Sequence, residues 1–143
     1  GVKIHWVGDF QPGTLPSPSF IGLAPAGLND GPALEQVAHA LPYQELYADK
    51  AYAYLKRAHG LPFTVMAPVK TQKGQAHLDA ADVWLSRAVS RVRQPVESIF
   101  NWIEEKTGIE IASKVRSSQG LLVHVFGRLA AAMFVRNVLP QSA

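Results

Sequence analysis

The sequence predicts a mixed α/β fold with a long C-terminal helical region, on three observations. Short segments rich in β-branched and aromatic residues alternate with helical patterns in the first half of the chain. Apolar residues at helical spacing run through most of the second half. The 143 residues are 48% hydrophobic and 17% charged, which is the composition of a soluble globular protein. We therefore expect one domain spanning residues 1–143.

Two strands and a helix are expected first. Residues 2–7 and 20–23 have strand composition, and turn-forming residues from Gly8 to Gly13 follow the first of them. A helix is expected to start around Asp30, whose side chain can cap free backbone N–H groups. Its apolar residues recur at helical spacing, and Pro42 is expected to end it.

The following elements place an aspartate at the end of a buried strand. Residues 45–49 have the pattern of that strand, with Asp49 at its C-terminal end. A helix over residues 52–59 and a strand over residues 63–67 come next. Strands that alternate with helices in this way indicate an α/β layer architecture.

The second half is predicted to be mostly helical. After a polar loop at residues 70–75, a long helix is expected from Asp79 to about Lys106, and a last helix over about 121–138. Pro95 interrupts the long helix, so we expect a kink or the start of a second helix there. One apolar stripe defines this helix: Leu85, Val89, Val92, Val96, Ile99 and Ile103.

The composition excludes several classes of function. The chain has no cysteine, which excludes disulfides, thiolate zinc sites and cysteine nucleophiles. The longest apolar stretches, such as residues 129–135, are far shorter than the roughly 20 residues that span a bilayer, so no membrane partner is expected. Residues 1–6 have a strand pattern rather than that of a signal peptide. The five histidines lack ligand spacing, and no glycine-rich phosphate loop is present. A cytoplasmic protein is expected.

The net charge of +3 is unevenly distributed along the chain. Residues 1–69 contain four Lys or Arg and five Asp or Glu, a net charge of −1. Residues 70–143 contain ten Lys or Arg and six Asp or Glu, a net charge of +4. A basic half favours an anionic partner, of which nucleic acid is the commonest.

Two carboxylates stand out by their positions. Asp49 follows a predicted buried strand, at the edge where α/β folds gather their ligands. Glu97 lies one residue past the apolar stripe, and Arg93 and Asn101 share its flank of the helix. The structural alternative is that Asp49 caps a helix and Glu97 pairs with Arg93. Spacing by itself favours this alternative.

Several segments, in their order along the chain, resemble the bacterial insertion-sequence transposases of the DDE class. Residues 46–52, LYADKAY, are similar to the strand-end Asp-Lys-Gly-Tyr motif that carries the family's second catalytic aspartate. Residues 91–102, RVRQPVESIFNW, are similar to the helical Arg-x-x-x-Glu-x-x-Phe motif that carries the third acid. Residues 1–6, 26–30 and 117–122 resemble a strand, a loop and a helix start of the same family. The resemblance covers almost the whole chain.

The chain departs from the family pattern at three positions near these acids. Ala51 stands in place of the family glycine, and Ser90 in place of a tyrosine that often precedes the arginine. Glu104 stands where a lysine is expected seven residues after the catalytic glutamate. Lys106 is near that position but out of register.

The family's first aspartate comes from a strand that precedes the segment similar to residues 1–6. We therefore expect a truncated catalytic domain that lacks this strand and the N-terminal DNA-binding region, and that is poorly active alone. Asp9 is the only acidic residue before Asp30, and it lies in a predicted hairpin turn. A sheet without its first strand has an unpaired position, so we expect the chain alone to be either marginally stable or a homodimer.

The resemblance implies an RNase H-like fold, with a mixed sheet flanked by helices, and a metal-dependent DNA transposase. Asp49 and Glu97 are the implied catalytic residues and metal ligands, with Asp49 bridging two Mg²⁺ or Mn²⁺ ions and Glu97 holding one. Carboxylates suit this role because hard divalent ions take oxygen ligands. Two ions about 3.5–4 Å apart activate the attacking oxygen and stabilise the leaving oxygen during phosphodiester hydrolysis and strand transfer.

The implied partner is double-stranded DNA, both the terminal repeats of the element and the target, in a cytoplasmic, nucleoid-associated protein. Six basic residues are expected to contact phosphates: Lys50, Lys70, Lys73, Arg87, Arg91 and Arg93. The large aromatic residues of the long helix, Trp84, Phe100 and Trp102, are expected to pack in the core rather than to stack on bases.

Two alternative functions share the sequence features. One is a catalytically inactive transposase fragment or a DNA-binding regulator, which has the same fold motifs without the first aspartate. The other is a structural interaction module of unrelated function, for which the segments around Asp49 and Glu97 resemble the family by coincidence.

Overall fold

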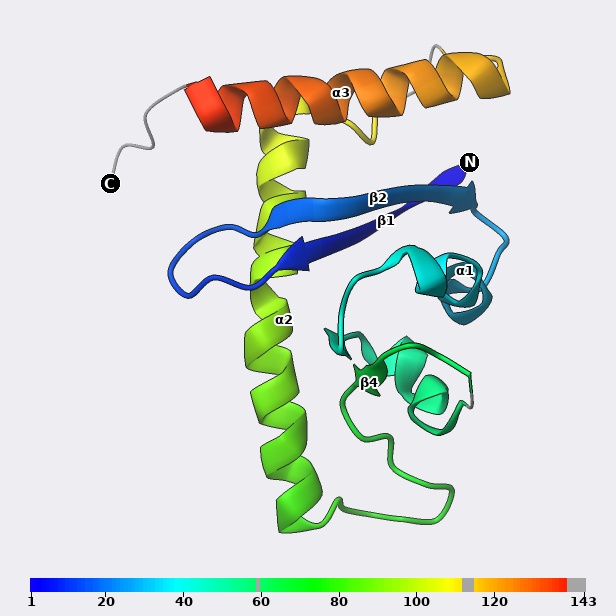
Figure 1. The fold of residues 1–143 in the computed structure, drawn as a ribbon, viewed down its shortest axis with the longest axis vertical. Helices are drawn as coiled ribbons and strands as arrows, with labels where there is room; N and C mark the ends of the chain where they lie inside the picture. The colour runs from blue at the N-terminus through cyan, green and yellow to red at the C-terminus, as the bar shows by residue number, and fades with distance from the viewer. Residues whose placement is uncertain (59, 112–114, 139–143) are drawn as a thin grey trace. The chain divides into compact units, whose positions relative to one another are not determined.

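The structure, a computed structural model, describes residues 1–58, 60–111 and 115–138. It is a mixed α/β protein with small sheets and about 50% helix, as the sequence predicts. The chain divides into two compact units, Gly1–Val96 and residues 97–143. The long helix α2 contributes to both units (Figure 1).

Strands β1 (Val2–Asp9) and β2 (Ser17–Pro25) form an antiparallel hairpin in the first unit. Both are longer than the sequence predicts (Figure 1). Gly8 and Asp9 belong to the first strand instead of the turn, because pairing continues past an irregularity in the register between Val7 and Gly8.

Helix α1 (Asp30–Val37) begins after Asn29, which has the extended backbone of a helix cap. The Asp30 side chain does not act as this cap. It accepts a hydrogen bond from Lys3 Nζ at 3.1 Å instead, and the same ammonium group donates to the Leu28 carbonyl at 3.0 Å. The helix ends before Pro42, because a 3₁₀ turn η1 (Ala38–Ala40) follows it.

The second sheet consists of two short parallel strands, β3 (Glu45–Tyr47) and β4 (Thr64–Met66). The Ala48 amide extends the pairing by donating to the Met66 carbonyl at 2.8 Å. Between the strands lies η2 (Lys50–Arg57), a 3₁₀ helix where the sequence predicts an ordinary helix. His59, the expected end of that helix, lies outside the described residues.

A single apolar cluster joins these elements of the first unit. Half-buried side chains from the hairpin, among them Val7 and Phe20, pack against this cluster. It therefore ties the loop around Asp49 to α1 and to both small strands. Its buried members are Leu34, Ala38, Leu41, Ala48, Leu55, Phe63, Val65 and Ala67.

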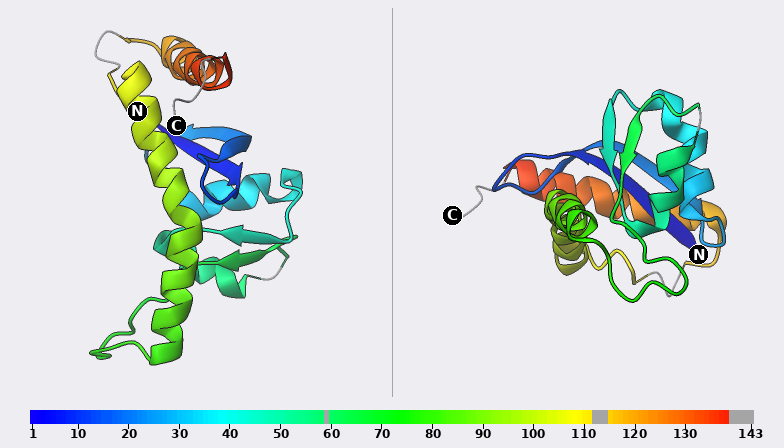
Figure 2. Two further views of the ribbon diagram at one scale, coloured as in Figure 1. Left: turned by 90° about the vertical axis from the view of Figure 1, so that its left-hand side faces the viewer. Right: turned by 90° about the horizontal axis from the view of Figure 1, so that it is seen from below.

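Helix α2 (Ala80–Thr107) is one continuous element that contains Pro95 (Figure 2). The sequence predicts either a kink or the start of a new helix at Pro95. No new helix starts there, because α2 continues through the proline. The predicted apolar stripe is buried at Val89, Ile99 and Ile103, whereas Leu85 at its N-terminal end is 37% exposed.

In the second unit, the end of α2 is joined to helix α3 (Ser118–Val138) by hydrogen bonds. Gly108 ends α2 with a φ of +57°, a conformation that suits glycine. Arg128 Nη1 then donates to the Thr107 carbonyl at 2.5 Å, and a ring nitrogen of His124 lies 3.0 Å from the Ile109 carbonyl oxygen. The Ser117 hydroxyl caps the new helix by accepting from the Gly120 amide at 3.0 Å.

Helix α3 is also long and apolar enough to cross a membrane, judged by length and composition. The length of uninterrupted apolar stretches does not predict this property, because Arg128 and Arg136 interrupt the apolar run. A core helix of a soluble protein passes the same test, so this finding is weak evidence for a membrane span.

Candidate functional site

Asp49 lies on the surface where the parallel strand pair ends. It comes two residues after the last residue of β3 and directly after Ala48, which is buried. Its carboxylate Oδ1 accepts a hydrogen bond from the Lys50 amide and so caps η2. The capping role considered from the sequence is therefore present, and the side chain is also exposed at the strand end.

Tyr52 shows that Asp49 shares its surroundings with a second acid. The pKa of the Tyr52 phenol is raised from 10.0 to about 12, first by burial and then by the negative charges of Asp30 and Asp49. Two carboxylates from separate elements thus create a negative potential around one phenol. All three residues belong to the first unit, and the charge of Asp30 is offset by its ion pair with Lys3.

Asp30 is held in this position by the ion pair with Lys3 Nζ, at 3.1 Å. Local sequence patterns predict only that Asp30 lies in a loop and at the start of a helix. The pairing with a lysine of β1, 27 residues away, could not be found from local patterns. The feature of the sequence that could have pointed to Asp30 is the segment of residues 26–30, which resembles a loop of the transposase family.

Glu97 is exposed on α2 and is the first residue of the second unit, whereas Asp49 belongs to the first unit. Arg93, one helical turn before Glu97, is half-buried. Asp9 is exposed and accepts a hydrogen bond from the Tyr43 hydroxyl at 2.8 Å. In the part of the chain that the structure describes, no three His, Cys, Asp or Glu residues gather closely enough to hold a metal ion.

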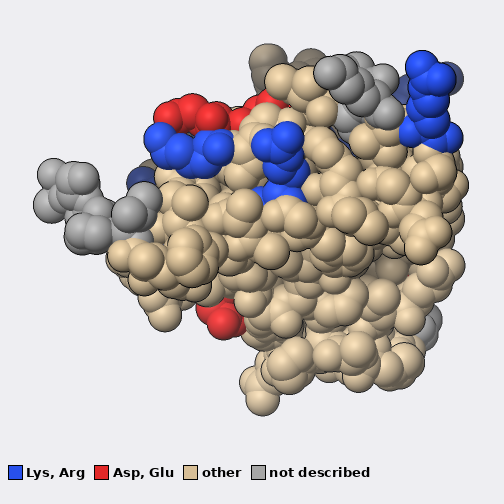
Figure 3. All heavy atoms as spheres, turned by 90° about the horizontal axis from the view of Figure 1, so that it is seen from above, with Lys and Arg blue, Asp and Glu red and all other residues tan. Residues whose placement is uncertain are grey.

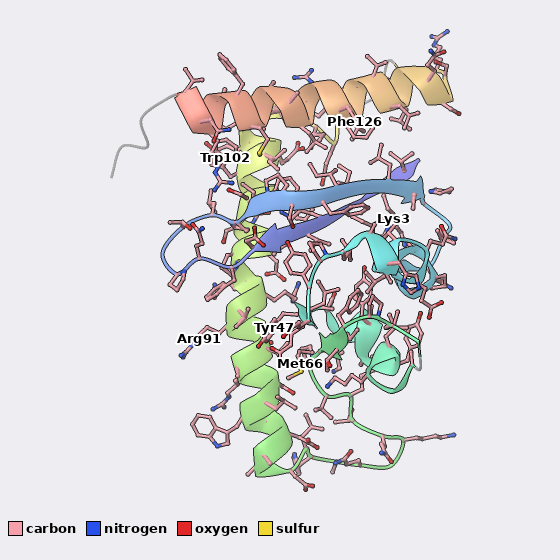
Figure 4. All side chains as sticks on the ribbon, viewed as in Figure 1. Lys3, Tyr47, Met66, Arg91, Trp102 and Phe126 are labelled. Atoms are coloured by element: carbon pink, nitrogen blue, oxygen red, sulfur yellow. The ribbon has the colours of Figure 1, made fainter. Side chains whose placement is uncertain are left out.

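Most of the predicted DNA-contacting residues are exposed. Lys50, Lys70, Lys73 and Arg91 all have exposed side chains. Arg91 points away from Tyr47 and Met66, the last residues of the parallel strands (Figure 4). On the face drawn in Figure 3, Lys and Arg side chains are few and separated, so that face contains no basic patch.

Trp84 contradicts the expectation that the aromatic residues of the long helix are buried. Its side chain is 69% exposed, and Arg87 lies over its ring with the guanidinium carbon 5.8 Å from the ring centroid. Phe100 and Trp102 are half-buried. The sequence pattern could not separate these three residues, since exposure depends on which other elements cover the helix.

Glu104, which stands where the family has a lysine, has a local structural role. Its carboxylate accepts a hydrogen bond from the Glu110 amide at 2.9 Å, in the turn that follows α2. An acidic side chain engaged with the backbone in this way supplies no positive charge for a phosphate. The DNA contact that the family lysine would make is thus absent at this position.

No protein-family model matches the chain, and comparisons with curated proteins and with solved structures find no match either.

Proposed function

We propose that this chain is a catalytic core of the DDE transposase class with an RNase H-like fold, which hydrolyses and transfers DNA strands at insertion-sequence ends. The observation that carries the proposal is the position of Asp49, exposed where the two parallel strands end. In α/β sheets, ligands bind outside the carboxyl ends of the strands. The resemblance of the segments around Asp49 and Glu97 to the transposase motifs supplies the reaction.

The donor chemistry at Asp49 suits a hard divalent ion such as Mg²⁺ or Mn²⁺. The exposed Asp49 carboxylate would serve as an oxygen ligand. For Glu97, the role of a carboxylate ligand is implied by the resemblance alone. Two such ions, when bound, supply activation of the attacking oxygen and stabilisation of the leaving oxygen.

The basic residues have a separate task in this proposal. Lys50 directly follows Asp49 and is exposed, so its ammonium group can hold a phosphate close to the acid. Lys70 and Lys73 lie on an exposed loop between β4 and α2. Arg91 and Arg93 add positive charge along α2. These residues would orient double-stranded DNA in a cytoplasmic, nucleoid-associated protein.

The test is nicking of a supercoiled plasmid that carries terminal inverted repeats, with Mg²⁺ or Mn²⁺ added. Asp49→Asn and Glu97→Gln keep the size of each side chain and are expected to lower nicking by about 100-fold or more. Glu105→Gln is the matched control, because Glu105 is an exposed acid on the same helix that pairs with Lys106. Equal nicking by Asp49→Asn and the unchanged chain would contradict the catalytic role.

A second candidate function is that of an inactive fragment or a DNA-binding regulator. It is favoured by one observation: Glu104, which stands where the family has a lysine, accepts a hydrogen bond from the Glu110 amide and offers no positive charge to DNA. The regulator would bind the same DNA without cleaving it. Plasmid binding that is unaffected by Asp49→Asn, with no nicking in either metal, would establish this second function in place of the first.

A further inference from the structure

We propose that Trp84 and Arg87 form a binding site for an unpaired DNA base, with the Trp84 indole as the stacking surface. The proposal rests on the proposed function, because it takes DNA as the molecule on which the chain acts. Trp84 is 69% exposed, although tryptophan is highly buried on average in folded proteins. A large aromatic ring left in water offers a flat apolar surface on which any base can stack.

Arg87 holds the indole in place on the surface of α2. Its guanidinium carbon lies 5.8 Å from the ring centroid, within the range of a cation–π interaction. This contact restrains the ring, so less conformational entropy is lost when a base binds. A guanidinium over one face of the ring leaves the other face for stacking.

The charges along this side of α2 favour a nucleic acid strand. Arg91 comes seven residues after Trp84, which places the two about 20° apart around the helix and two turns apart along it. Arg91 is exposed and points away from the parallel strands (Figure 4). Of the three arginines in residues 83–96, Arg87 and Arg91 lie within about 60° of Trp84 around the helix, whereas Arg93 lies on the opposite side, and this segment contains no acid. Asp82, the nearest acid before them, lies roughly 160° around the helix from Trp84.

A loop with further positive charge is anchored next to the same helical turn. The Val69 amide donates a hydrogen bond to the Ser86 hydroxyl at 2.9 Å, and Ser86 lies between Trp84 and Arg87 in the sequence. Lys70 directly follows Val69 and is exposed. Ser86 lies roughly 160° around the helix from Trp84, so the basic side chains near a base on the indole are those of Arg87 and Arg91.

The proposed occupant is single-stranded DNA, because a base inside a duplex presents no free face to a ring. Fluorescence anisotropy titration of the full chain with a labelled single strand, and with the same sequence as a duplex, tests this. Trp84→Ala is expected to weaken single-strand binding about 5- to 150-fold, the range for one lost stacking contact. Duplex binding is expected to change less than about twofold, and Trp84→Phe is expected to restore most of the single-strand affinity.

Phe134→Ala provides the matched control, because Phe134 is an aromatic residue of α3 with a similar exposed fraction, 66%. It is expected to leave both affinities unchanged. Arg91→Ala removes a charge rather than a ring, so it should weaken both forms of DNA and lower the slope of log affinity against log salt by about 0.7–0.9. Circular dichroism of each variant verifies that its helix content is retained.

Single-strand binding that is equal in Trp84→Ala and the unchanged chain overturns the proposal, as does an equal loss for single strand and duplex. Absence of any single-strand binding also overturns it. The catalytic proposal fails separately: single-strand binding that depends on Trp84, together with plasmid nicking that Asp49→Asn leaves unchanged, supports the stacking site and refutes the catalytic role of Asp49. Nicking without any effect of Trp84→Ala on DNA binding refutes only the stacking site.

Discussion

The contact between α1 and η2 allows a direct test of the packing around Asp49. A Cβ added to Gly31 of α1 would lie 1.4 Å from the hydroxyl oxygen of Tyr54 and 2.3 Å from its Cζ. No real pair of atoms approaches so closely without a bond, so Gly31→Ala must displace the Tyr54 ring. Gly31 does not have a positive φ, so its backbone accepts alanine without strain.

Two opposing effects decide the change in the free energy of unfolding. Alanine is favoured over glycine in a helix by about 1 kcal/mol. Overpacking costs about 1–3 kcal/mol, and the cost here is moderated because Tyr54 is 55% exposed and has room to move. We therefore expect Gly31→Ala to lower the free energy of unfolding by about 0.5–1 kcal/mol. In a Tyr54→Ala background the same change should raise it by about 0.5–1 kcal/mol.

Urea unfolding of the four proteins in this double-mutant cycle measures the coupling between the two positions. A coupling of about 1–2 kcal/mol is expected, with the opposite sign of the Gly31→Ala effect in the two backgrounds. The reasoning is refuted if Gly31→Ala has the same effect in both backgrounds to within about 0.5 kcal/mol. The contact between Gly31 and Tyr54 bears on the candidate site because Tyr54 belongs to η2, the helix that Asp49 caps.

Two further predictions concern the titration of Tyr52 and self-association. The pKa of Tyr52 is about 12 in the folded chain against an ordinary 10.0. The unfolded chain therefore loses this proton first, and stability should fall as the pH rises from about 10 to about 12. Urea unfolding of the unchanged chain and of Tyr52→Phe measures this fall, and parallel profiles for the two would contradict it. Each sheet in the described residues has two strands, so every strand has an unpaired edge. A concentration-dependent dimer is expected in sedimentation analysis, whereas a monomer at every concentration would count against it.

The secondary structure followed the sequence most closely where its cause is local. Residues 79–106 carry an apolar stripe at helical spacing, and α2 occupies Ala80–Thr107. Hydrogen bonds within a helix join residues close in the chain, so periodicity is enough to find it. The hairpin was located for the same reason, although its length depended on how far the strands continue to pair.

Other elements could not be predicted because their form depends on packing. The segment after Asp49 has helical composition, yet η2 is a 3₁₀ helix whose Leu55 is 2% exposed in the apolar cluster of the first unit. Pro95 left two outcomes open, and α2 continues through it. The buried side chains of Val89 and Ile99 on either side of the proline contribute packing that offsets a missing hydrogen bond.

The sequence by itself determined the mixed α/β class, the long helical region and the position of Asp49 after a short strand, because alternation, periodicity and strand-end chemistry are local properties. The expectation that this strand is buried was wrong: Glu45 and Tyr47 of β3 are exposed and Leu46 is half-buried, which depends on the elements that cover the strand. The tertiary structure decided which residues share surroundings. It brought the charge of Asp30 to Tyr52 beside that of Asp49, and it left Trp84 exposed under Arg87. Long-range packing and the covering of a helix face involve residues far apart in the chain, and no local pattern specifies them.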